Sequence, residues 1–195
     1  MTLAERISLI RPGVTRGDGA WADLGAGDGA FTAALASLLG PGAVIHAVDR
    51  DRRSLRALEQ ELALPARSSG SAAVRLVCVP GDFTAELPLP PLDGALIANA
   101  LHFHSDHSAV LAHVRRWLAP GAVLIVVEYD VHRANPWVPH PLPWQVFADT
   151  AARAGFTAVR LLGRLPSAYH GSMYAAACTT GPNPALRSSP SAWRA

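Results

Sequence analysis

The sequence predicts an α/β fold with one doubly wound, mostly parallel seven-stranded sheet that ends in an antiparallel hairpin. Short apolar runs alternate with helix-like segments between residues 20 and 154. The last two apolar runs, at 156–162 and 173–178, follow one another with no helical segment between them. Strand–helix alternation is typical of parallel sheets, whereas two consecutive strands pair in antiparallel fashion.

The expected helices carry their own start or stop signals. Thr2 and Glu5 match a capping box, and the apolar residues that follow recur on one helical face. A proline or a Gly-Pro pair stands where the second, third and fourth helices should end, and Gly155 follows the fifth. The expected helices span residues 2–10, 30–39, 52–64, 106–118 and 142–154.

The expected strands are short apolar runs, and the fifth is continuously apolar, as a buried parallel strand should be. These strands span residues 20–24, 43–48, 74–79, 92–98, 122–129, 156–162 and 173–178. Residues 67–73 are expected to form a polar loop. Residues 181–195 are rich in Pro, Ser and Ala and are expected to be a disordered tail, which leaves 1–180 as a single domain.

Composition limits the possible functions. The 195 residues are half apolar, enough for one domain with a sizeable core, and no apolar run approaches the ~20 residues that span a membrane. Cys78 and Cys178 lie in apolar strand-like runs, which indicates reduced thiols, and residues 1–11 contain no signal-peptide core. A cytoplasmic location is therefore expected. The formal net charge is only +2 and the arginines are mostly scattered, which argues against a nucleic-acid-binding face.

The chain contains no lysine, because all 17 Lys and Arg residues are arginine. This absence excludes a P-loop lysine, a Schiff-base lysine and a Tyr-x-x-x-Lys proton relay. Much of the chemistry expected of a nicotinamide-dependent reductase is therefore missing.

A glycine-rich turn follows the first expected strand, where an apolar run ends in Asp23. Gly25, Gly27 and Gly29 alternate with other residues, and a helical segment begins at once. Glycines at a strand-to-helix turn let the backbone pass close to a ligand, and the following helix offers free N–H groups. The turn is therefore expected to hold a nucleotide-like ligand.

Two ligand classes compete for this turn, beside the alternative of a turn with no ligand. The glycine spacing fits a dinucleotide pattern, but a pyrophosphate is disfavoured beside the Asp23 carboxylate. S-adenosylmethionine has no phosphate, and its ammonium and sulfonium groups suit an acid at the strand end. The segment from Asp23 to Gly29, with Asp49 further on, resembles the donor-binding motif of class I S-adenosylmethionine-dependent methyltransferases. The resemblance implies a Rossmann-like sheet and S-adenosylmethionine as cofactor.

The expected donor-binding residues lie at successive strand ends, where ligands of such sheets bind. Asp49 is placed to accept the ribose hydroxyls, with a helix N-cap as its alternative role. The resemblance places Asp82 and Phe83 beside the adenine, although a plain Asp turn is the alternative. The full set of expected donor-binding residues is Asp23, Gly25, Ala26, Gly27, Gly29, Asp49, Arg50, Asp82, Phe83 and Asn99.

The stretch from Asn99 to Asp106 resembles a histidine-containing segment of small-molecule methyltransferases, and Asp106 is expected to cap the next helix. His102, or otherwise His104 or His140, is the candidate base, since imidazole accepts a proton near neutral pH. Packing or capping roles are the alternative. His102, His104 and His107 could also suggest zinc, but no acid or cysteine completes a recognisable spacing, so no metal is expected.

Residues 132–144 contain four prolines and two tryptophans and lead away from the end of the fifth strand. This stretch is expected to form a wall or lid over an apolar or aromatic acceptor, with Tyr129, Trp137 and Trp144 as contacts. The alternative is an ordinary connection that packs on the sheet. Few residues precede the first strand, so the acceptor pocket is expected to be open, or completed by this loop or by a second subunit in a homodimer.

Missing motifs narrow the acceptor class. The sequence lacks the Asn-Pro-Pro-Tyr type of motif after the fourth strand and a Pro-Cys nucleophile. These absences argue against methylation of DNA bases, and the lack of lysine excludes the tetrad of ribose methyltransferases. The sequence therefore favours a methyltransferase that acts on a small metabolite. A non-catalytic donor-binding protein and an RNA methyltransferase that needs a partner remain as alternatives.

Overall fold

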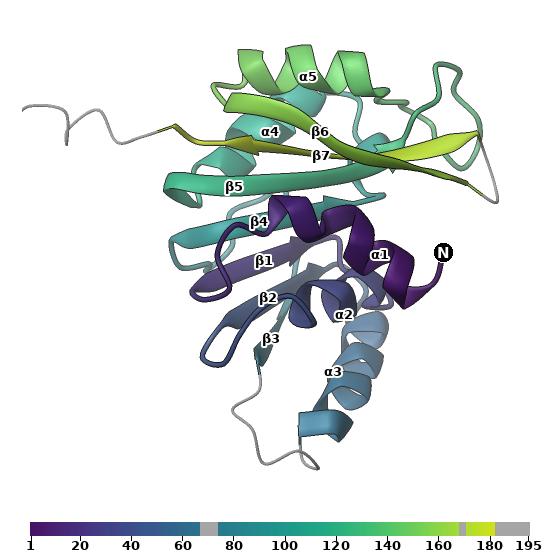
Figure 1. Cartoon of the computed structure of the whole chain (residues 1–195). Helices are drawn as coiled ribbons and strands as arrows, with labels where there is room; N and C mark the ends of the chain where they lie inside the picture. Colours follow the sequence, from purple (N-terminus) through teal and green to yellow (C-terminus); the bar gives the residue numbers. More distant parts are fainter. Residues whose placement is uncertain (67–73, 168–170, 182–195) are drawn as a thin grey trace, which may run out of the picture.

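The computed structural model describes residues 1–66, 74–167 and 171–181 (Figure 1). The side chains of residues 62–66 are not part of this description. The polar loop expected at 67–73 and the tail expected at 181–195, apart from Gly181, also lie outside the described residues.

The described strands form one seven-stranded sheet in the order β3-β2-β1-β4-β5-β7-β6. Strands β1 to β5 are parallel, and β7 pairs antiparallel with both β5 and β6. The predicted doubly wound sheet and its terminal hairpin are confirmed. The strands are β1 (Ala20–Leu24), β2 (Val44–Asp49), β3 (Arg75–Pro80), β4 (Leu92–Ala98), β5 (Leu118–Tyr129), β6 (Thr157–Pro166) and β7 (Ser172–Thr179).

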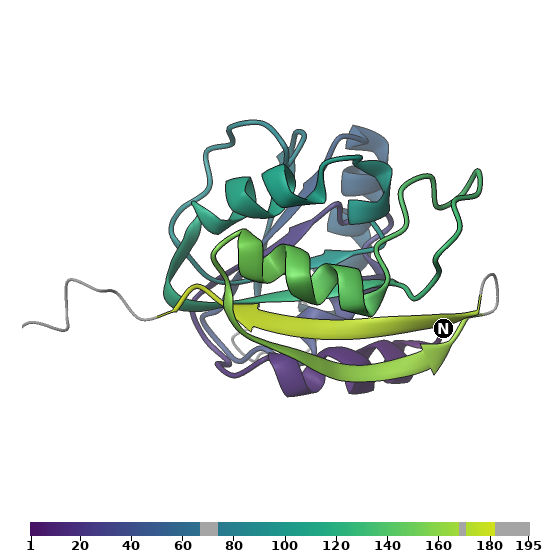
Figure 2. The ribbon, with the colours of Figure 1, turned by 90° about the horizontal axis from the view of Figure 1, so that it is seen from above.

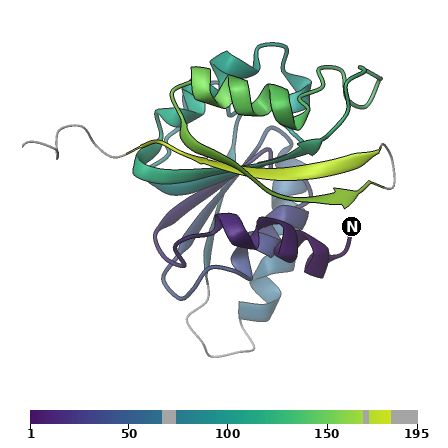
Figure 3. The same cartoon turned by 45° about the horizontal axis from the view of Figure 1, so that its top comes forward.

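Helices cover both faces of the sheet (Figure 3). α1, α2 and α3 lie over one face, and α4 and α5 lie over the other. The helices are α1 (Leu3–Ile10), α2 (Ala30–Ala36), α3 (Arg52–Ala66), α4 (His107–Arg115) and α5 (Trp144–Arg153), with short 3-10 turns at Arg11–Gly13 and Leu101–Phe103. Both predicted caps are confirmed: Thr2 and Glu5 form the capping box of α1, and Asp106 caps α4.

The boundary between α4 and β5 differs from the prediction. The helix ends at Arg115, and β5 begins at Leu118, so that Pro120 and Gly121 lie inside the strand. Leu92 pairs with Leu118 but Gly94 pairs with Val123, so the register shifts between these two pairs. Pairing with β4 extends the strand backward across the Pro-Gly signal, and Gly121 adopts a positive φ of 79° within this irregular stretch, which a glycine does without steric cost.

Two apolar layers hold the sheet between its helices. The α4–α5 layer is built on residues such as Leu24, Leu124 and Phe147, and the α1–α2 layer on Trp21 and Ile125. Burial on both faces explains the continuously apolar sequence of the central strands.

The chain reverses its winding direction between β1 and β4, which are adjacent parallel strands. After β1 the chain enters α2 on one face, and after β4 it enters α4 on the other. The loops beyond the carboxyl ends of these two strands therefore diverge and leave a crevice, which is where ligands of such sheets bind.

Candidate functional site

Two adjoining cavities lie beyond the carboxyl ends of β1 and β4, and Gly25, Gly27 and Asn99 line both of them. The first cavity has a volume of about 400 Å³, and Asp23, Ala26 and Tyr129 are among its lining residues. The second has a volume of about 300 Å³, and its lining includes the expected donor residues Asp49, Arg50, Asp82 and Phe83. Of the ten expected donor-binding residues, only Gly29 lines neither cavity.

The glycine turn shows why its glycines differ in role. Gly27 has a positive φ of 53°, and a Cβ built on it would meet no atom within 4 Å, because it would point into open space at the cavities. A Cβ on Gly29 would lie 2.2 Å from Cδ1 of Leu58 on α3. Gly27 therefore keeps the cavity side of the glycine turn open, and this turn (residues 25–29) is called the cradle below. Gly29 instead permits the close packing of α3 against the turn.

Asp49 lies at the end of β2 and organises the cradle. Its Oδ2 accepts a hydrogen bond from the Gly27 amide at 2.8 Å, and its Oδ1 accepts one from the Asp51 amide at 2.8 Å. The N-cap role belongs to Asp51, whose side chain accepts from the Arg53 amide and the Ser54 hydroxyl. Each carboxylate oxygen of Asp49 retains a further lone pair that could accept a ligand hydroxyl.

Asp82 forms the Asp turn that was the alternative expected for it, and it also lines the second cavity. Its Oδ1 accepts hydrogen bonds from the amide and hydroxyl of Thr84, which is an Asp turn, and its Oδ2 lies 3.6 Å from Arg50 Nη1. Partial burial raises the pKa of Asp82, but the Thr84 hydrogen bonds and the positive charge of Arg50 outweigh it and hold the pKa below its ordinary value. Asp82 therefore presents an ionised carboxylate to the second cavity.

Asp23 is only 1% exposed at the end of β1. The hydroxyl of Thr32 donates to its Oδ2 at 2.6 Å, and its buried Oδ1 has no hydrogen-bond partner among the described residues. Burial raises the pKa of Asp23 to about 7, against the opposing hydrogen bond from Thr32. A buried carboxylate with one unsatisfied oxygen at a cavity wall is suited to a cationic or hydrogen-bond-donating ligand.

Asn99 follows β4 and adopts a positive φ of 53°, which is uncommon for a residue with a side chain. Its amide donates to the carbonyl of Val127 at 2.9 Å, and its buried Oδ1 has no partner among the described residues. Backbone strain next to a cavity is a frequent property of functional sites. The turn after β4 therefore presents a second unsatisfied acceptor to the same crevice as Asp23.

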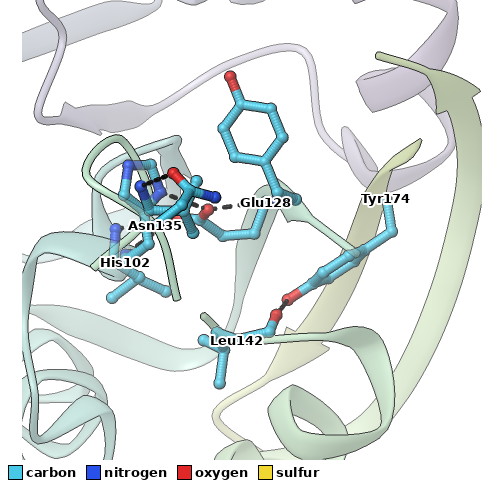
Figure 4. A network of polar contacts seen from close by, with 8 residues as sticks. His102, Glu128, Asn135, Leu142 and Tyr174 are labelled. Atoms are coloured by element: carbon cyan, nitrogen blue, oxygen red, sulfur yellow. Dashed lines mark hydrogen bonds and ion pairs between the residues drawn. The ribbon is translucent and has the colours of Figure 1, made fainter. Parts of the chain in front are cut away.

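His102, the first candidate base, is 3% exposed and lines neither cavity. Its Nδ1 lies 2.7 Å from Oε2 of Glu128 (Figure 4). The other oxygen of Glu128 accepts from the amides of Leu101 and His102. The structure therefore places His102 behind the site, in a buried contact with the end of β5.

The other candidate histidines occupy different positions. His104 lines the second cavity, with its ring edge-on to Phe83 at a centroid distance of 5.3 Å, and burial lowers its pKa below the ordinary value. His140 donates its backbone amide to the carbonyl of His102 at 3.0 Å and lines neither cavity. In the described part of the chain, no three His, Cys, Asp or Glu residues are grouped so as to hold a metal ion.

The Pro-rich stretch is anchored to the body of the protein. Trp137 is 75% exposed, while Trp144 packs against Phe147 and Tyr174 with ring centroids 6.3 and 6.1 Å away. The Tyr174 hydroxyl donates to the carbonyl of Leu142 at 2.8 Å (Figure 4). Of the three expected acceptor contacts, only Tyr129 lines one of the two cavities.

The wall of the first cavity opposite the cradle comes from other segments. These residues, which the sequence did not single out, are Met1, Arg6, Phe31, Pro166, Ser167 and Met173. Met1 precedes α1, Arg6 lies on α1 and Phe31 on α2, and the other three lie at the end of β6 and the start of β7. These described ends of β6 and β7 lie on the same side of the molecule as the loop between β5 and α5 (Figure 2). No local motif marks them, because the sheet topology alone brings these distant segments to one cavity.

Residues 22–124, more than half of the chain, match a family model described as a methyltransferase domain. No curated protein sequence matches the chain significantly. Within the described residues, no helix combines the length and the apolar character needed to cross a membrane.

Three solved structures share the fold at low sequence identity. An arsenic(III) S-adenosylmethionine methyltransferase from Chlamydomonas reinhardtii has a TM-score of 0.69 at 21% identity, over 88% of this chain and 65% of that one. CurJ carbon methyltransferase has a TM-score of 0.69 at 16% identity, and the match covers 86% of this chain and 50% of that one. A SAM-dependent methyltransferase from Aquifex aeolicus has a TM-score of 0.68 at 14% identity, and the match covers 92% of this chain and 99% of that one. The chain thus spans less than two thirds of the first two proteins and nearly all of the third.

Proposed function

The chain belongs to the family of methyltransferase domains, whose methyl donor is S-adenosylmethionine, and we propose that it methylates a small apolar or aromatic metabolite. The observation that carries the proposal is the pair of adjoining cavities that meet at Gly27. One contains the unsatisfied carboxylate of Asp23 and the other the carboxylate of Asp49. This arrangement complements a ligand with a cationic group at one end and a hydroxylated nucleoside at the other.

The second cavity suits the adenosine half of the donor. Asp49 would accept the ribose hydroxyls through its remaining lone pairs, while Asp82 would accept from the adenine amino group. Phe83, which is 6% exposed, would contact the ring, and Arg50 would lie at the adenine edge. The open space beyond Gly27 would let the link between the ribose and the methionine half of the donor pass from one cavity to the other.

The first cavity suits the methionine half. Asp23 and Asn99 each present a buried oxygen with no partner among the described residues, and both would accept hydrogen bonds from the donor's ammonium group. Burial of the Asp23 carboxylate makes its ionisation unfavourable. A bound cation would stabilise the charged form, so donor binding and loss of the proton are expected to be coupled.

The donor supplies an activated methyl group on a sulfonium sulfur. The acceptor's nucleophilic atom forms a bond to the methyl carbon as the carbon–sulfur bond breaks, and the sulfur keeps the electron pair. The protein contributes mainly by alignment and exclusion of water, which can supply several kcal/mol. His102 lies behind the site, His140 lines neither cavity and His104 lines the cavity assigned to the adenosine half, so we place no histidine base at the methyl group.

Isothermal titration calorimetry with S-adenosylhomocysteine and NAD tests the donor assignment. Binding of S-adenosylhomocysteine in the micromolar range without binding of NAD is expected. Tight NAD binding, or no binding of S-adenosylhomocysteine, would overturn the assignment. The acceptor requires a methylation screen against a metabolite library.

Donor binding with no turnover across the screen would favour the non-catalytic alternative. Methyl transfer to RNA that depends steeply on salt would favour the RNA alternative, since phosphate contacts release counterions. The mixed surface charge of the chain and its net charge of +2 support the small-molecule assignment over that alternative.

A further inference from the structure

Arg6 is a half-buried arginine on α1 that lines the first cavity. Its Nε is buried and has no hydrogen-bond partner, and the side chain forms no ion pair, within the described part of the chain. It is also the only basic side chain among the described residues that line this cavity. A guanidinium stays charged at all relevant pH values, so a buried Nε–H without an acceptor is unfavourable.

The position of Arg6 is fixed by its surroundings. Its guanidinium carbon lies 5.9 Å from the ring centroid of Phe31, a buried residue in the first turn of α2. The helix that carries Arg6 is held at its start by the Thr2–Glu5 capping box. The cation is therefore preorganised at the cavity wall, which lowers the cost of ligand binding.

The acidic side chains that line the first cavity do not neutralise the charge of Arg6. Asp23 is engaged by Thr32 on one oxygen, and Asp28 accepts a hydrogen bond from the Ala30 amide. Neither carboxylate lies within ion-pair distance of Arg6, and the described residues provide no other partner. The cavity thus has an acidic side at the cradle and a separate basic group on α1, which complements a ligand with both charges.

We propose that Arg6 binds a carboxylate in the first cavity, through the bidentate geometry that a guanidinium offers. This inference rests on the proposed function of the same site. Two carboxylates could reach Arg6: that of the methionine half of the donor, or one carried by the acceptor. The methionine half is smaller than a 400 Å³ cavity, so both could be present together.

The first experiment tests the donor as the source. Calorimetry compares S-adenosylhomocysteine with its decarboxylated analogue, S-adenosylthiopropylamine, in the wild type, Arg6→Gln and Arg11→Gln. Arg11 is exposed and lines neither cavity, so it is the matched control. If Arg6 binds the donor carboxylate, Arg6→Gln weakens the binding of S-adenosylhomocysteine by about 10- to 100-fold and leaves the affinity for the analogue unchanged.

The second experiment tests the acceptor as the source. Proteins saturated with S-adenosylhomocysteine are titrated with benzoate or with neutral benzamide and followed by NMR. If Arg6 binds an acceptor carboxylate, benzoate binds in preference to benzamide in the wild type and in Arg11→Gln, but not in Arg6→Gln. Arg6→Met keeps the long apolar stem without the charge and replaces Arg6→Gln in both experiments if that variant does not fold.

Equal behaviour of the Arg6 variants and the wild type in both experiments overturns the inference. Failure of the proposed function gives a different result. In that case the wild type and Arg11→Gln themselves do not bind S-adenosylhomocysteine or its decarboxylated analogue.

Discussion

Glu128 binds His102 through a contact of 2.7 Å between Oε2 and Nδ1, with both side chains almost fully buried. The second oxygen of Glu128 accepts from the amides of Leu101 and His102. One carboxylate at the end of β5 therefore fixes the turn that follows β4. That turn also carries Asn99, which is strained and borders both cavities. Glu128 is accordingly a positioning residue for the turn that borders both cavities.

Glu128→Gln should destabilise the protein and weaken donor binding. The amide group of glutamine cannot reproduce all four acceptor contacts of the carboxylate, and a buried polar group left unsatisfied costs about 1–3 kcal/mol. Thermal unfolding and calorimetry with S-adenosylhomocysteine measure both effects. Glu86→Gln is the control, because Glu86 pairs with Arg116 on the surface and should contribute at most about 1 kcal/mol. Equal effects of the two substitutions would contradict the positioning role.

Asp49 and Asp51 allow ribose binding to be separated from helix capping. Asp49→Ala should weaken the binding of S-adenosylhomocysteine by about 1–3 kcal/mol through loss of charge-assisted hydrogen bonds. Asp51→Ala removes the cap of α3 and should lower the free energy of unfolding by about 1 kcal/mol without the same loss of affinity. A comparable affinity loss in both variants would assign Asp49 a purely structural role.

Gly27→Val should abolish donor binding because the new side chain would project into the space between the two cavities. Gly42→Val is a close control: Gly42 also has a positive φ, of 87°, and a Cβ there would likewise meet no atom within 4 Å. Both variants share the backbone strain, but only Gly27 borders the cavities. Calorimetry on the two folded variants distinguishes strain from obstruction, and equal affinities would exclude obstruction.

Asp23 should make the stability of the ligand-free protein fall as pH rises. Its pKa is about 7 when folded, against an ordinary value of 3.8, so between these values the folded state retains a proton that the unfolded state has lost. Stability is therefore lost between about pH 4 and pH 7, by about 4 kcal/mol in all. Below pH 4 both states are protonated, and above pH 7 the loss is complete.

Asp23→Asn keeps the shape and removes the titration. The gain in melting temperature of Asp23→Asn over the wild type should be larger at pH 8 than at pH 4. Asp18→Asn, at an exposed position, is the control for the substitution itself. If the gain at pH 8 equals that at pH 4, Asp23 is already ionised in the folded protein across this range.

The sequence by itself determined the succession of strands and helices along the chain, the glycine turn and nine of the residues that line the two cavities. Each of these depends on a local pattern: apolar runs identify the strands, and Asp23 to Gly29 identify the turn. Parallel strand ends meet at one edge of the sheet, so Asp49, Asp82 and Asn99 could be assigned to one site from their positions after successive strands.

Only the tertiary structure decided which side chains face the ligand cavities. The start of β5 at Leu118 depends on pairing with β4, which extends the strand across Pro120 and Gly121. His102 turns toward Glu128, 26 residues later in the chain, and away from the cavities. Arg6 reaches the first cavity because α1 packs beside α2 and the β6–β7 hairpin. Side-chain direction and contacts between distant segments arise from packing, so no local pattern in the sequence could specify them.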